Sequence, residues 1–311
     1  MTRAVVFAYH DVGVRCLRAL LAAGVEVSLV VTHEDQPGET IWFDSVARHA
    51  GWHGIPVLTP EDPNARETVA RVQAADPDFI FSFYYRRMLK APLLALARRG
   101  AFNMHGSLLP RYRGRAPVNW VLVYGEQETG ATLHRMVEKP DAGAILGQEA
   151  VPILPDDTAV EVFHKVTVAA ELVLWRYLPG LLAGTASEQP QDLARGSYFG
   201  GRSAADGAID WRAGVRAIHN LVRAVAPPYP GAFSQAGGLP LRLLRTLPAA
   251  GTGAAEPVLY WRADRVWAAC PDGLLQVLEF ELDGTVGTAR AFHRRFGSRA
   301  LPLINSIREP T

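Results

Sequence analysis

The feature of this sequence that most constrains its fold is a regular alternation in the first hundred residues. Four short apolar runs are each followed by a stretch in which apolar residues recur at helical spacing. The apolar runs are 4–11, 25–35, 55–60 and 79–85, and the helical stretches are 15–24, 43–54, 65–76 and 91–100. Strands that alternate with helices form parallel sheets with helices on both faces. The alternation therefore predicts an α/β domain with a Rossmann-like, open, mostly parallel sheet.

The pattern changes after the Gly- and Ser-rich tract RGSYFGGRSAADG. Before it we expect a fifth strand at 100–107 and a long amphipathic helix near 158–184. After it, one helix at 212–225 precedes several short strands, which is typical of a small β-barrel. A chain of 311 residues is long enough for two domains. The predicted domains are a catalytic domain at 1–203 and a C-terminal, OB-like β-barrel domain at 204–311.

Charge and hydropathy argue against several classes of partner. Lys and Arg number 32 and Asp and Glu number 31, so the chain has no overall basic field for nucleic acid or an anionic membrane. The N-terminus lacks the apolar run and the cleavage site of a signal peptide. No uninterrupted run approaches the roughly 18 apolar residues that span a bilayer. We therefore expect a cytoplasmic protein with neither a membrane nor a nucleic-acid partner.

Several common ligand-binding motifs are missing. The first predicted strand-to-helix turn, FAYHDVGVR, holds one glycine and no GxGxxG or P-loop pattern. The nine histidines form no HExxH motif, and Cys16 and Cys270 lie far apart without CxxC spacing. Reduced, structural thiols are therefore expected. These absences disfavour a dinucleotide site, a P-loop and a metal centre.

The strongest candidates for chemistry lie on the fifth predicted strand. Asn103 and His105 are two residues apart, so their side chains point to the same face near the carboxyl end of the sheet. Taken alone, such a pair is more often a satisfied hydrogen-bonding pair than a catalytic one. Asp141, in the loop KPDAGAI after the next strand, can be brought beside it. His10, at the end of the first strand, can line the same cleft or hold a turn.

An amide, an imidazole and a carboxylate without a Ser or Cys nucleophile suit direct acyl transfer to an amine. Asn103 can donate an N–H to the developing oxyanion, and His105 can take the proton of the amine. Asp141, hydrogen-bonded to the imidazole, would fix its tautomer and stabilise its charged form.

Residues 102–145, FNMHGSLLPRYRGRAPVNWVLVYGEQETGATLHRMVEKPDAGAI, resemble the signature of the folate-dependent formyltransferases. In that family Asn, His and Asp, in this order, transfer a formyl group from 10-formyltetrahydrofolate to an amine. The sequence is most similar to the formyltransferase domains of bifunctional polymyxin-resistance enzymes. These N-formylate UDP-4-amino-4-deoxy-L-arabinose in lipid A modification. The similarity covers almost the whole chain, including VVFAYHD, THEDQPGE, FSFYYR and NLVRAVAPPYPGAF.

The resemblance implies roles for individual positions. Asn103, His105 and Asp141 match the catalytic residues, and Arg115 matches an arginine that binds substrate. The folate contacts fall on Arg87, Met88, Leu89, Val137, Glu138, Lys139, Pro140 and Asp141. The chain departs from the expected pattern at Arg87, where His is usual, and at Lys139 and Pro140, where Arg and Ala are expected. These changes affect folate binding only if the contacts use side chains. We expect Arg111 and Arg113 on a solvated loop face or packed around Tyr112.

Two other functions stay open. One is methionyl-tRNA formyltransferase, and the other is a non-catalytic or hydrolytic folate-binding module. The tRNA enzymes carry a basic insertion after the second strand, whereas this chain has the acidic THEDQPGETIWFD. Residues 204–311 hold 12 Arg and no Lys against 9 Asp or Glu, which is a mild excess. A UDP-amino sugar is therefore the expected substrate.

The bifunctional relatives continue into an NAD-dependent decarboxylase, whereas this sequence ends at Thr311. We therefore expect 10-formyltetrahydrofolate as co-substrate and neither NAD nor a metal. The oligomeric state and the exact amino sugar stay open.

Overall fold

The computed structural model describes residues 2–305, which form two compact units. The first unit comprises the residues up to 117 together with 128–152 and 163–200. The second unit comprises 118–127, 153–162 and the residues from 201 onward. The stretch 118–127 of the second unit begins inside helix α5 (Pro117–Val123). The stretch 153–162 begins just before helix α6 (Ala159–Ala183). The boundary predicted between residues 203 and 204 stays a prediction.

The first unit is built on a seven-stranded sheet with the order β3-β2-β1-β4-β5-β7-β8. Its strands are β1 (Arg3–Ala8), β2 (Glu26–Val31), β3 (Val57–Leu58), β4 (Phe79–Phe83), β5 (Gly100–His105), β7 (Glu128–Arg135) and β8 (Ile145–Pro152). The strands β1 to β5 are parallel, β7 is antiparallel to β5, and β8 is antiparallel to β7. The Rossmann-like, mostly parallel sheet predicted from the sequence is therefore confirmed.

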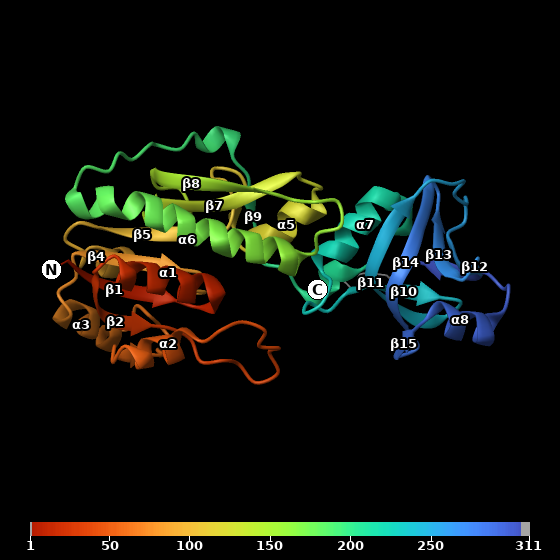
Figure 1. The fold of residues 1–311 in the computed structure, drawn as a ribbon, viewed down its shortest axis with the longest axis horizontal. Helices are drawn as coiled ribbons and strands as arrows, with labels where there is room; N and C mark the ends of the chain where they lie inside the picture. The colour runs from red at the N-terminus through yellow and green to blue at the C-terminus, as the bar shows by residue number, and fades with distance from the viewer. Residues whose placement is uncertain (1, 306–311) are drawn as a thin grey trace. The chain divides into compact units, whose positions relative to one another are not determined.

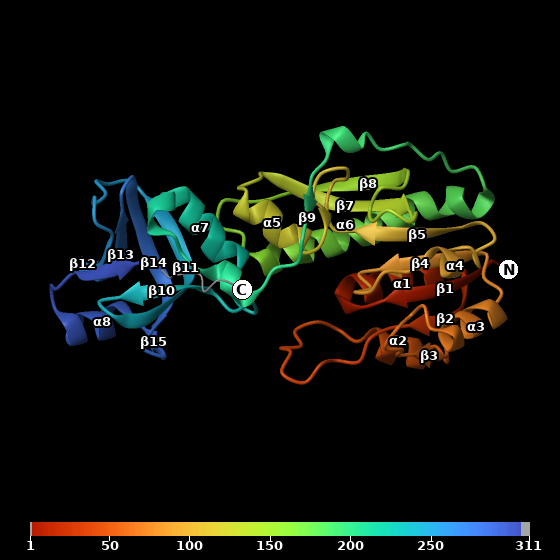
Figure 2. The ribbon, with the colours of Figure 1, turned by 180° about the vertical axis from the view of Figure 1, so that it is seen from behind.

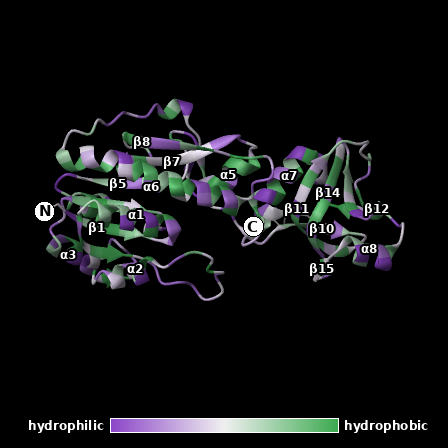
Figure 3. Ribbon diagram, viewed as in Figure 1, coloured by the Kyte–Doolittle hydropathy of each residue, from purple (hydrophilic) through white to green (hydrophobic). Residues whose placement is uncertain are grey.

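Helices cover both faces of this sheet. They are α1 (His10–Ala22), α2 (Val46–Trp52), α3 (Arg66–Ala74), α4 (Ala91–Leu94) and α6. Val5 and Phe7 of β1 pack in one cluster with Val72 of α3 and Leu93 of α4. Figure 1 shows α1 and α6 in front of the sheet, and Figure 2 shows α3 and α4 from behind. The central strands are apolar on both faces, as parallel strands between two helical layers must be (Figure 3).

Helix α6 is long and apolar enough to cross a membrane by length and composition, with a mean hydropathy of 1.3. Its buried side chains include Val166, Ala170, Val173 and Leu174, which recur at the spacing of one helix face. The apolar character of α6 is therefore accounted for by packing as a core helix of the first unit.

Residues 188–200, which we call the strap, run along the first unit after α6. Glu188 forms an ion pair with Arg135, and Gln189 pairs with Ile145 in an isolated bridge. Further on, β9 (Tyr198–Phe199) pairs in parallel with β6 (Arg113–Gly114). The strap thus contacts the two loops that follow β5 and β7.

The second unit is a closed antiparallel barrel. Its elements are α7 (Val215–Ala224), β10 (Ala232–Ala236), β11 (Leu239–Ala249), β12 (Val258–Arg262), β13 (Arg265–Cys270), β14 (Gly273–Leu282), β15 (Thr285–Gly287), α8 (Ala289–Phe296) and β16 (Leu301–Ile304). The strand order β11-β10-β16-β12-β13-β14 closes because β14 also pairs with β11. Ile218 and Val222 of α7 join the barrel core. The predicted C-terminal β-barrel is confirmed, with six closing strands.

Several elements were not among the predicted ones, namely the short strands β6, β9 and β15, the strands β8, β10 and β16, and helix α8. Strand β8, ILGQEAVP, lies at the edge of its sheet, and only Leu146 and Gly147 are buried in it. Helix α8, ARAFHRRF, buries only Phe292. Elements that bury little surface, such as β8 and α8, leave a weak apolar pattern in a sequence.

Candidate active site

Strand β5 presents Asn103 and His105 from the same side of the sheet, as their spacing predicts. Asn103 lies opposite Ser82 of β4 and His134 of β7. The strand ends at His105, and a Cβ atom on the following Gly106 would lie 1.9 Å from the Tyr84 hydroxyl oxygen. Only glycine therefore allows the chain to turn this closely past Tyr84.

Asp141 lies in the loop between β7 and β8, with a φ of 52°, which its short polar side chain tolerates. Its Oδ1 lies 3.5 Å from His105 Nδ1 and 3.5 Å from Asn103 Nδ2. Its Oδ2 accepts a hydrogen bond of 2.9 Å from the backbone N–H of Gly114. The structure therefore brings together the three residues that the sequence singles out.

The tautomer of His105 is set by the backbone. His105 Nε2 lies 2.8 Å from the carbonyl oxygen of Tyr112, and a carbonyl can only accept, so Nε2 carries the hydrogen. The other ring nitrogen, Nδ1, faces Asp141. This corrects the expectation that Asp141 fixes the tautomer by a hydrogen bond. Nδ1 is left as the nitrogen that can take up a proton, with a carboxylate beside it to stabilise the resulting charge.

Asp141 is held in its ionised form. Burial raises its pKa, but the neighbouring imidazole rings of His105 and His134 and the backbone N–H of Gly114 favour the charged form more strongly and leave the pKa well below the ordinary range. The carboxylate is therefore negative at neutral pH.

Three further residues support the site and were not singled out from the sequence. His134 lies beside Asn103 and Asp141. Gln191 of the strap donates from Nε2 to the carbonyl oxygens of Asp141 and Gly143, at 3.0 and 2.6 Å. Ser197 accepts through its Oγ from the backbone N–H of Tyr112 at 2.9 Å. The strap thus fixes both loops that carry the site, and no short motif signals contacts that span about 50 residues.

The constellation holds a hydrogen-bond donor, a base and a fixed negative charge. None of its side chains is a Ser or Cys nucleophile, and Ser107 donates its hydroxyl to the carbonyl oxygen of Arg111 at 2.7 Å. Such a set can position an electrophilic carbonyl, remove a proton from an attacking amine and stabilise the imidazolium that forms. It is therefore suited to transfer of an acyl group to an amine.

The two segments that the resemblance assigns to folate each expose one large apolar side chain. Met88 is 54 % exposed and Val137 is 42 % exposed, which is unusual for large apolar side chains. Leu89 is buried in the core cluster of the first unit, and Met136 packs against that same cluster. The remaining members of the two segments, Arg87, Glu138, Lys139 and Pro140, are exposed or half-buried.

Two guanidinium groups flank Gly114. Arg113 is only 8 % exposed, and its Nε is fully buried without a hydrogen-bond partner among residues 2–305. Arg115 is exposed, and its side chain forms no hydrogen bond or ion pair within the described part of the chain. The expectation of a solvated loop face is wrong for Arg113. Arg111 does pack on Tyr112, with its guanidinium carbon 5.6 Å from the ring centre.

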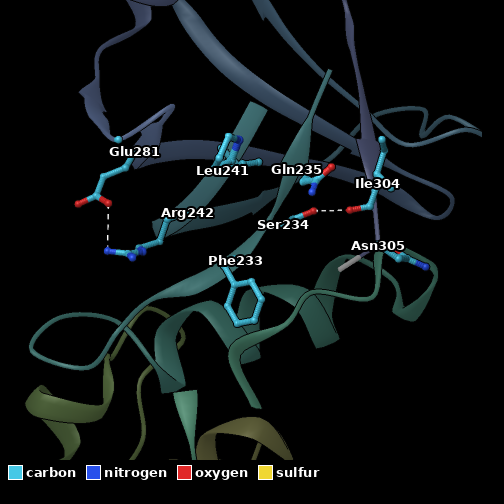
Figure 4. Close-up of a pocket in the computed structure, with 10 residues that line it drawn as sticks. Phe233, Ser234, Gln235, Leu241, Arg242, Glu281, Ile304 and Asn305 are labelled. Atoms are coloured by element: carbon cyan, nitrogen blue, oxygen red, sulfur yellow. Dashed lines mark hydrogen bonds and ion pairs between the residues drawn. The ribbon is translucent and has the colours of Figure 1, made fainter. Parts of the chain in front are cut away.

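A cavity of about 720 Å³ lies in the second unit and shares no residue with this constellation (Figure 4). Its two charged side chains, Arg242 and Glu281, form an ion pair of 3.1 Å, and Ser234 donates to the carbonyl oxygen of Ile304 at 2.6 Å. Arg242, Glu281 and Ser234 therefore have partners within the lining, and none of Asn103, His105 and Asp141 belongs to it.

Comparisons with known proteins agree with this assignment. The chain matches the model of the formyl transferase family over residues 7–178 and that of the formyl transferase C-terminal domain over residues 202–297. Its fold is similar to that of an N-formyltransferase from Helicobacter canadensis, solved with folinic acid and dTDP-3-aminofucose. That match has a TM-score of 0.69 and 20 % identity, and covers 90 % of this chain and 100 % of the other.

Two further solved structures share the fold. A sugar N-formyltransferase from a Shewanella species matches with a TM-score of 0.60 and 20 % identity, over 75 % of this chain and 92 % of the other. HypX from Aquifex aeolicus, in complex with tetrahydrofolic acid, matches with a TM-score of 0.63 and 18 % identity. That match covers 96 % of this chain and 45 % of HypX.

Proposed function

Since the chain belongs to the formyl transferase family and is a transferase of one-carbon groups, we propose that it moves a formyl group from 10-formyltetrahydrofolate to the amine of a nucleotide-linked amino sugar. The amine attacks the formyl carbon, the bond between that carbon and the folate nitrogen breaks, and tetrahydrofolate leaves. The catalytic roles fall on Asn103, His105 and Asp141.

The formyl donor is proposed from the surface that the chain offers. Arg87, Met88, Leu89 and the segment 137–141 would hold the folate, with the exposed Met88 and Val137 against its ring. Two of the similar structures contain folate compounds, namely folinic acid and tetrahydrofolic acid. The folate supplies the activated formyl group, and the protein residues supply position and proton transfer.

In this proposal His105 Nδ1 takes the proton of the amine, because Nε2 is committed to the carbonyl of Tyr112. Asp141 stabilises the imidazolium from 3.5 Å. Asn103 directs an N–H at the formyl oxygen, a contact of a kind worth on the order of 3 kcal/mol in acyl transfer.

The observation that carries the acceptor class is the pair of guanidinium groups on either side of Gly114, whose N–H binds Asp141. A guanidinium that is buried without an acceptor is costly, so it favours binding of an anion. A nucleotide diphosphate supplies such an anion with few charges, and it needs a local site rather than a field over the whole surface. This supports a nucleotide-linked amino sugar over a polynucleotide.

Within this class we propose UDP-4-amino-4-deoxy-L-arabinose as the acceptor, which would place the protein in lipid A modification and polymyxin resistance, in the cytoplasm. The support is the sequence similarity over residues 102–145 and the acidic segment at 32–44, where tRNA enzymes carry basic residues. A methionyl-tRNA formyltransferase and a folate hydrolase are the alternatives to be tested.

The test is to incubate the protein with 10-formyltetrahydrofolate and one acceptor at a time, and to follow release of tetrahydrofolate and the mass of the acceptor. The acceptors are UDP-4-amino-4-deoxy-L-arabinose, dTDP-3-aminofucose and methionyl-tRNA. We expect a gain of one formyl group on the UDP sugar and none on the tRNA. Formylation of dTDP-3-aminofucose alone would change the sugar, formylation of methionyl-tRNA would overturn the acceptor class, and release of formate without an acceptor would indicate a hydrolase.

A further inference from the structure

We propose that His134 is a positioning residue that holds the side-chain amide of Asn103 in the one orientation that formyl transfer requires. The inference rests on the proposed function, because it assigns to Asn103 the task of donating an N–H to the formyl oxygen. His134 lies within the segment 102–145 but was not among the candidate site residues identified from the sequence.

The strand pairing places His134 directly across from Asn103. The two residues are partners in the antiparallel pairing of β5 with β7, where opposite side chains stand close together on the same face. His134 is 2 % exposed, so its ring has no access to solvent that could satisfy its nitrogens. Each ring nitrogen must find its partner within the protein.

The partners of His134 determine its tautomer. Nδ1 lies 2.9 Å from the carbonyl oxygen of Arg135, which can only accept, so Nδ1 carries the hydrogen. In the neutral ring Nε2 then has only a lone pair. Asn103 Nδ2 lies 3.1 Å from Nε2 and donates to it.

This hydrogen bond decides which way the Asn103 amide points. With the amide turned over, its oxygen would face two acceptors, the lone pair of His134 Nε2 and Asp141 Oδ1. In the observed orientation Nδ2 donates one hydrogen to His134. Its other hydrogen has only Asp141 Oδ1 at 3.5 Å, which is longer than an ordinary hydrogen bond. That N–H is therefore free to move to a substrate oxygen.

An alternative role for His134 is to donate from Nε2 to Asp141. The distance of 3.5 Å to Asp141 Oδ1 is longer than the 3.1 Å to Asn103 Nδ2, and the donation would require both ring nitrogens to carry hydrogens. His105 also faces the same oxygen from 3.5 Å and already supplies the cationic partner when it takes up a proton. The geometry therefore favours a neutral His134 that accepts from Asn103.

The first test does not depend on activity. Long-range proton–nitrogen NMR spectra of the full chain with ¹⁵N-labelled histidine, assigned by comparison with the His134→Gln variant, should show His134 at neutral pH as the Nδ1–H tautomer with a bare Nε2. The Nε2–H tautomer, or a doubly protonated ring, would overturn the proposal whatever the enzyme transfers.

The second test compares two variants. His134→Gln keeps an acceptor oxygen near the position of Nε2, whereas His134→Leu keeps the bulk and removes the acceptor. We expect the Leu variant to lose kcat by about tenfold to a hundredfold with KM values within about twofold, and the Gln variant to recover most of the loss. Equal kcat values for the two variants, or a change in KM alone, would contradict the positioning role.

Failure of this inference and failure of the proposed function give different results. If the wild-type protein formylates no acceptor, the proposed function fails, and the tautomer still reports on the contact with Asn103. If the wild type is active and the two variants are equal, only the role of His134 fails. If the Leu variant does not fold, two measurements still test the proposal. It requires the Nδ1–H tautomer of His134 in the wild type and a near-normal kcat in the Gln variant.

Discussion

The two units of this protein each bury an arginine, and they treat it in opposite ways. Arg223 in the second unit is 6 % exposed, and its guanidinium donates to the side-chain oxygen of Asn220 and to the carbonyl oxygens of Leu154 and Asp157. Arg113 in the first unit is 8 % exposed, and none of the described residues accepts from its guanidinium. A buried donor without an acceptor costs about 1 to 3 kcal/mol or more when charged. Its presence beside the candidate site is consistent with the proposal that Arg113 binds an anion from outside the chain.

The backbone shows the same contrast. In the second unit, the non-glycine residues with positive φ include Ala263, Asp264 and Asp283, and all three lie in tight turns between neighbouring barrel strands. In the first unit, His10 begins α1 two residues after the end of β1, Tyr84 directly follows β4, and Asp141 carries the carboxylate of the candidate site. In the barrel these conformations lie in turns between strands, whereas in the first unit they include a residue of the candidate site. Asp76, between α3 and β4, shows that the first unit also uses this conformation in an ordinary connection.

The largest expected effect comes from two aspartates with the same backbone conformation. Asp141 has a φ of 52° and Asp283 has a φ of 56°, and Asn tolerates this conformation as well as Asp. We expect Asp141→Asn to lower kcat for formyl transfer by about a thousandfold, because the imidazolium loses its stabilising charge. Asp283→Asn loses only an exposed ion pair with Arg295 and should keep full activity. The measurement is the steady-state kcat of both variants. Equal kcat values would show that Asp141 has no larger role in the reaction than Asp283.

The second effect separates the two buried arginines. We expect Arg113→Gln to raise KM for the sugar nucleotide by about tenfold or more, and to leave the free energy of unfolding unchanged or higher, because no internal acceptor is lost. Arg223→Gln should leave KM unchanged and lower that free energy by about 1 to 3 kcal/mol, because it strips three acceptors of their donor. The measurements are KM and urea unfolding. A loss of stability in the Arg113 variant with normal KM would show that its role is structural.

A smaller effect concerns acid stability. Burial, together with Arg86 and His164, lowers the pKa of His10 to about 3, against roughly 6.5 in an unfolded chain. Between these values the unfolded chain binds more protons, so stability falls as the pH falls from about 6.5 toward 3. His10 alone should remove about 2 kcal/mol between pH 7 and pH 5.

The matched variant is His10→Asn. Asn tolerates the φ of 67° and can replace Nδ1 as acceptor for the backbone N–H of Asp11. It does not titrate, so urea unfolding of the variant should depend less on pH over this range, with His33 supplying part of the remaining slope because burial lowers its pKa to about 4. An unchanged slope would mean that His10 is not buried as a neutral ring.

The smallest expected effect is that of chelation. The proposed mechanism uses an amide, an imidazole and a carboxylate, and it gives a metal ion no task. We therefore expect prolonged treatment with EDTA, followed by gel filtration, to leave the rate of formyl transfer within experimental error. Loss of activity that zinc or magnesium restores would require a different mechanism.

Much of the fold was predictable because the central strands are buried on two faces. The runs at 4–11 and 79–85 are apolar without alternation, which marks strands covered by helices on both sides. The strap was not predictable in this way. Its contacts use Gln191 and Ser197 toward loop backbones, and hydrogen bonds to backbone groups impose no apolar period on the sequence.

For the site, the sequence predicted that Asn103 and His105 lie on one strand with Asp141 beside them, and the structure has this arrangement. The roles of these residues stay predictions. The tautomer of His105 and the position of His134 depend on which backbone carbonyl lies at each ring nitrogen, and only the packed structure determines that. The burial of Arg113 could not be predicted for a similar reason. Its strand, β6, pairs with β9, which lies 85 residues further along the chain.

The two sheets also differ in how easily a strand of another molecule could pair with their edges. Because β14 pairs back with β11, the closing strands of the barrel offer no free edge to another chain. Strand β8 is the last of its sheet, and Gln189 of the strap pairs only with Ile145, at its first residue. The half-buried Glu149, paired with Arg176, and the terminal Pro152 are the features that discourage a foreign strand there. If residues 188–200 were removed, we would expect aggregation to begin at β8, and a Lys at Ala150 to suppress it.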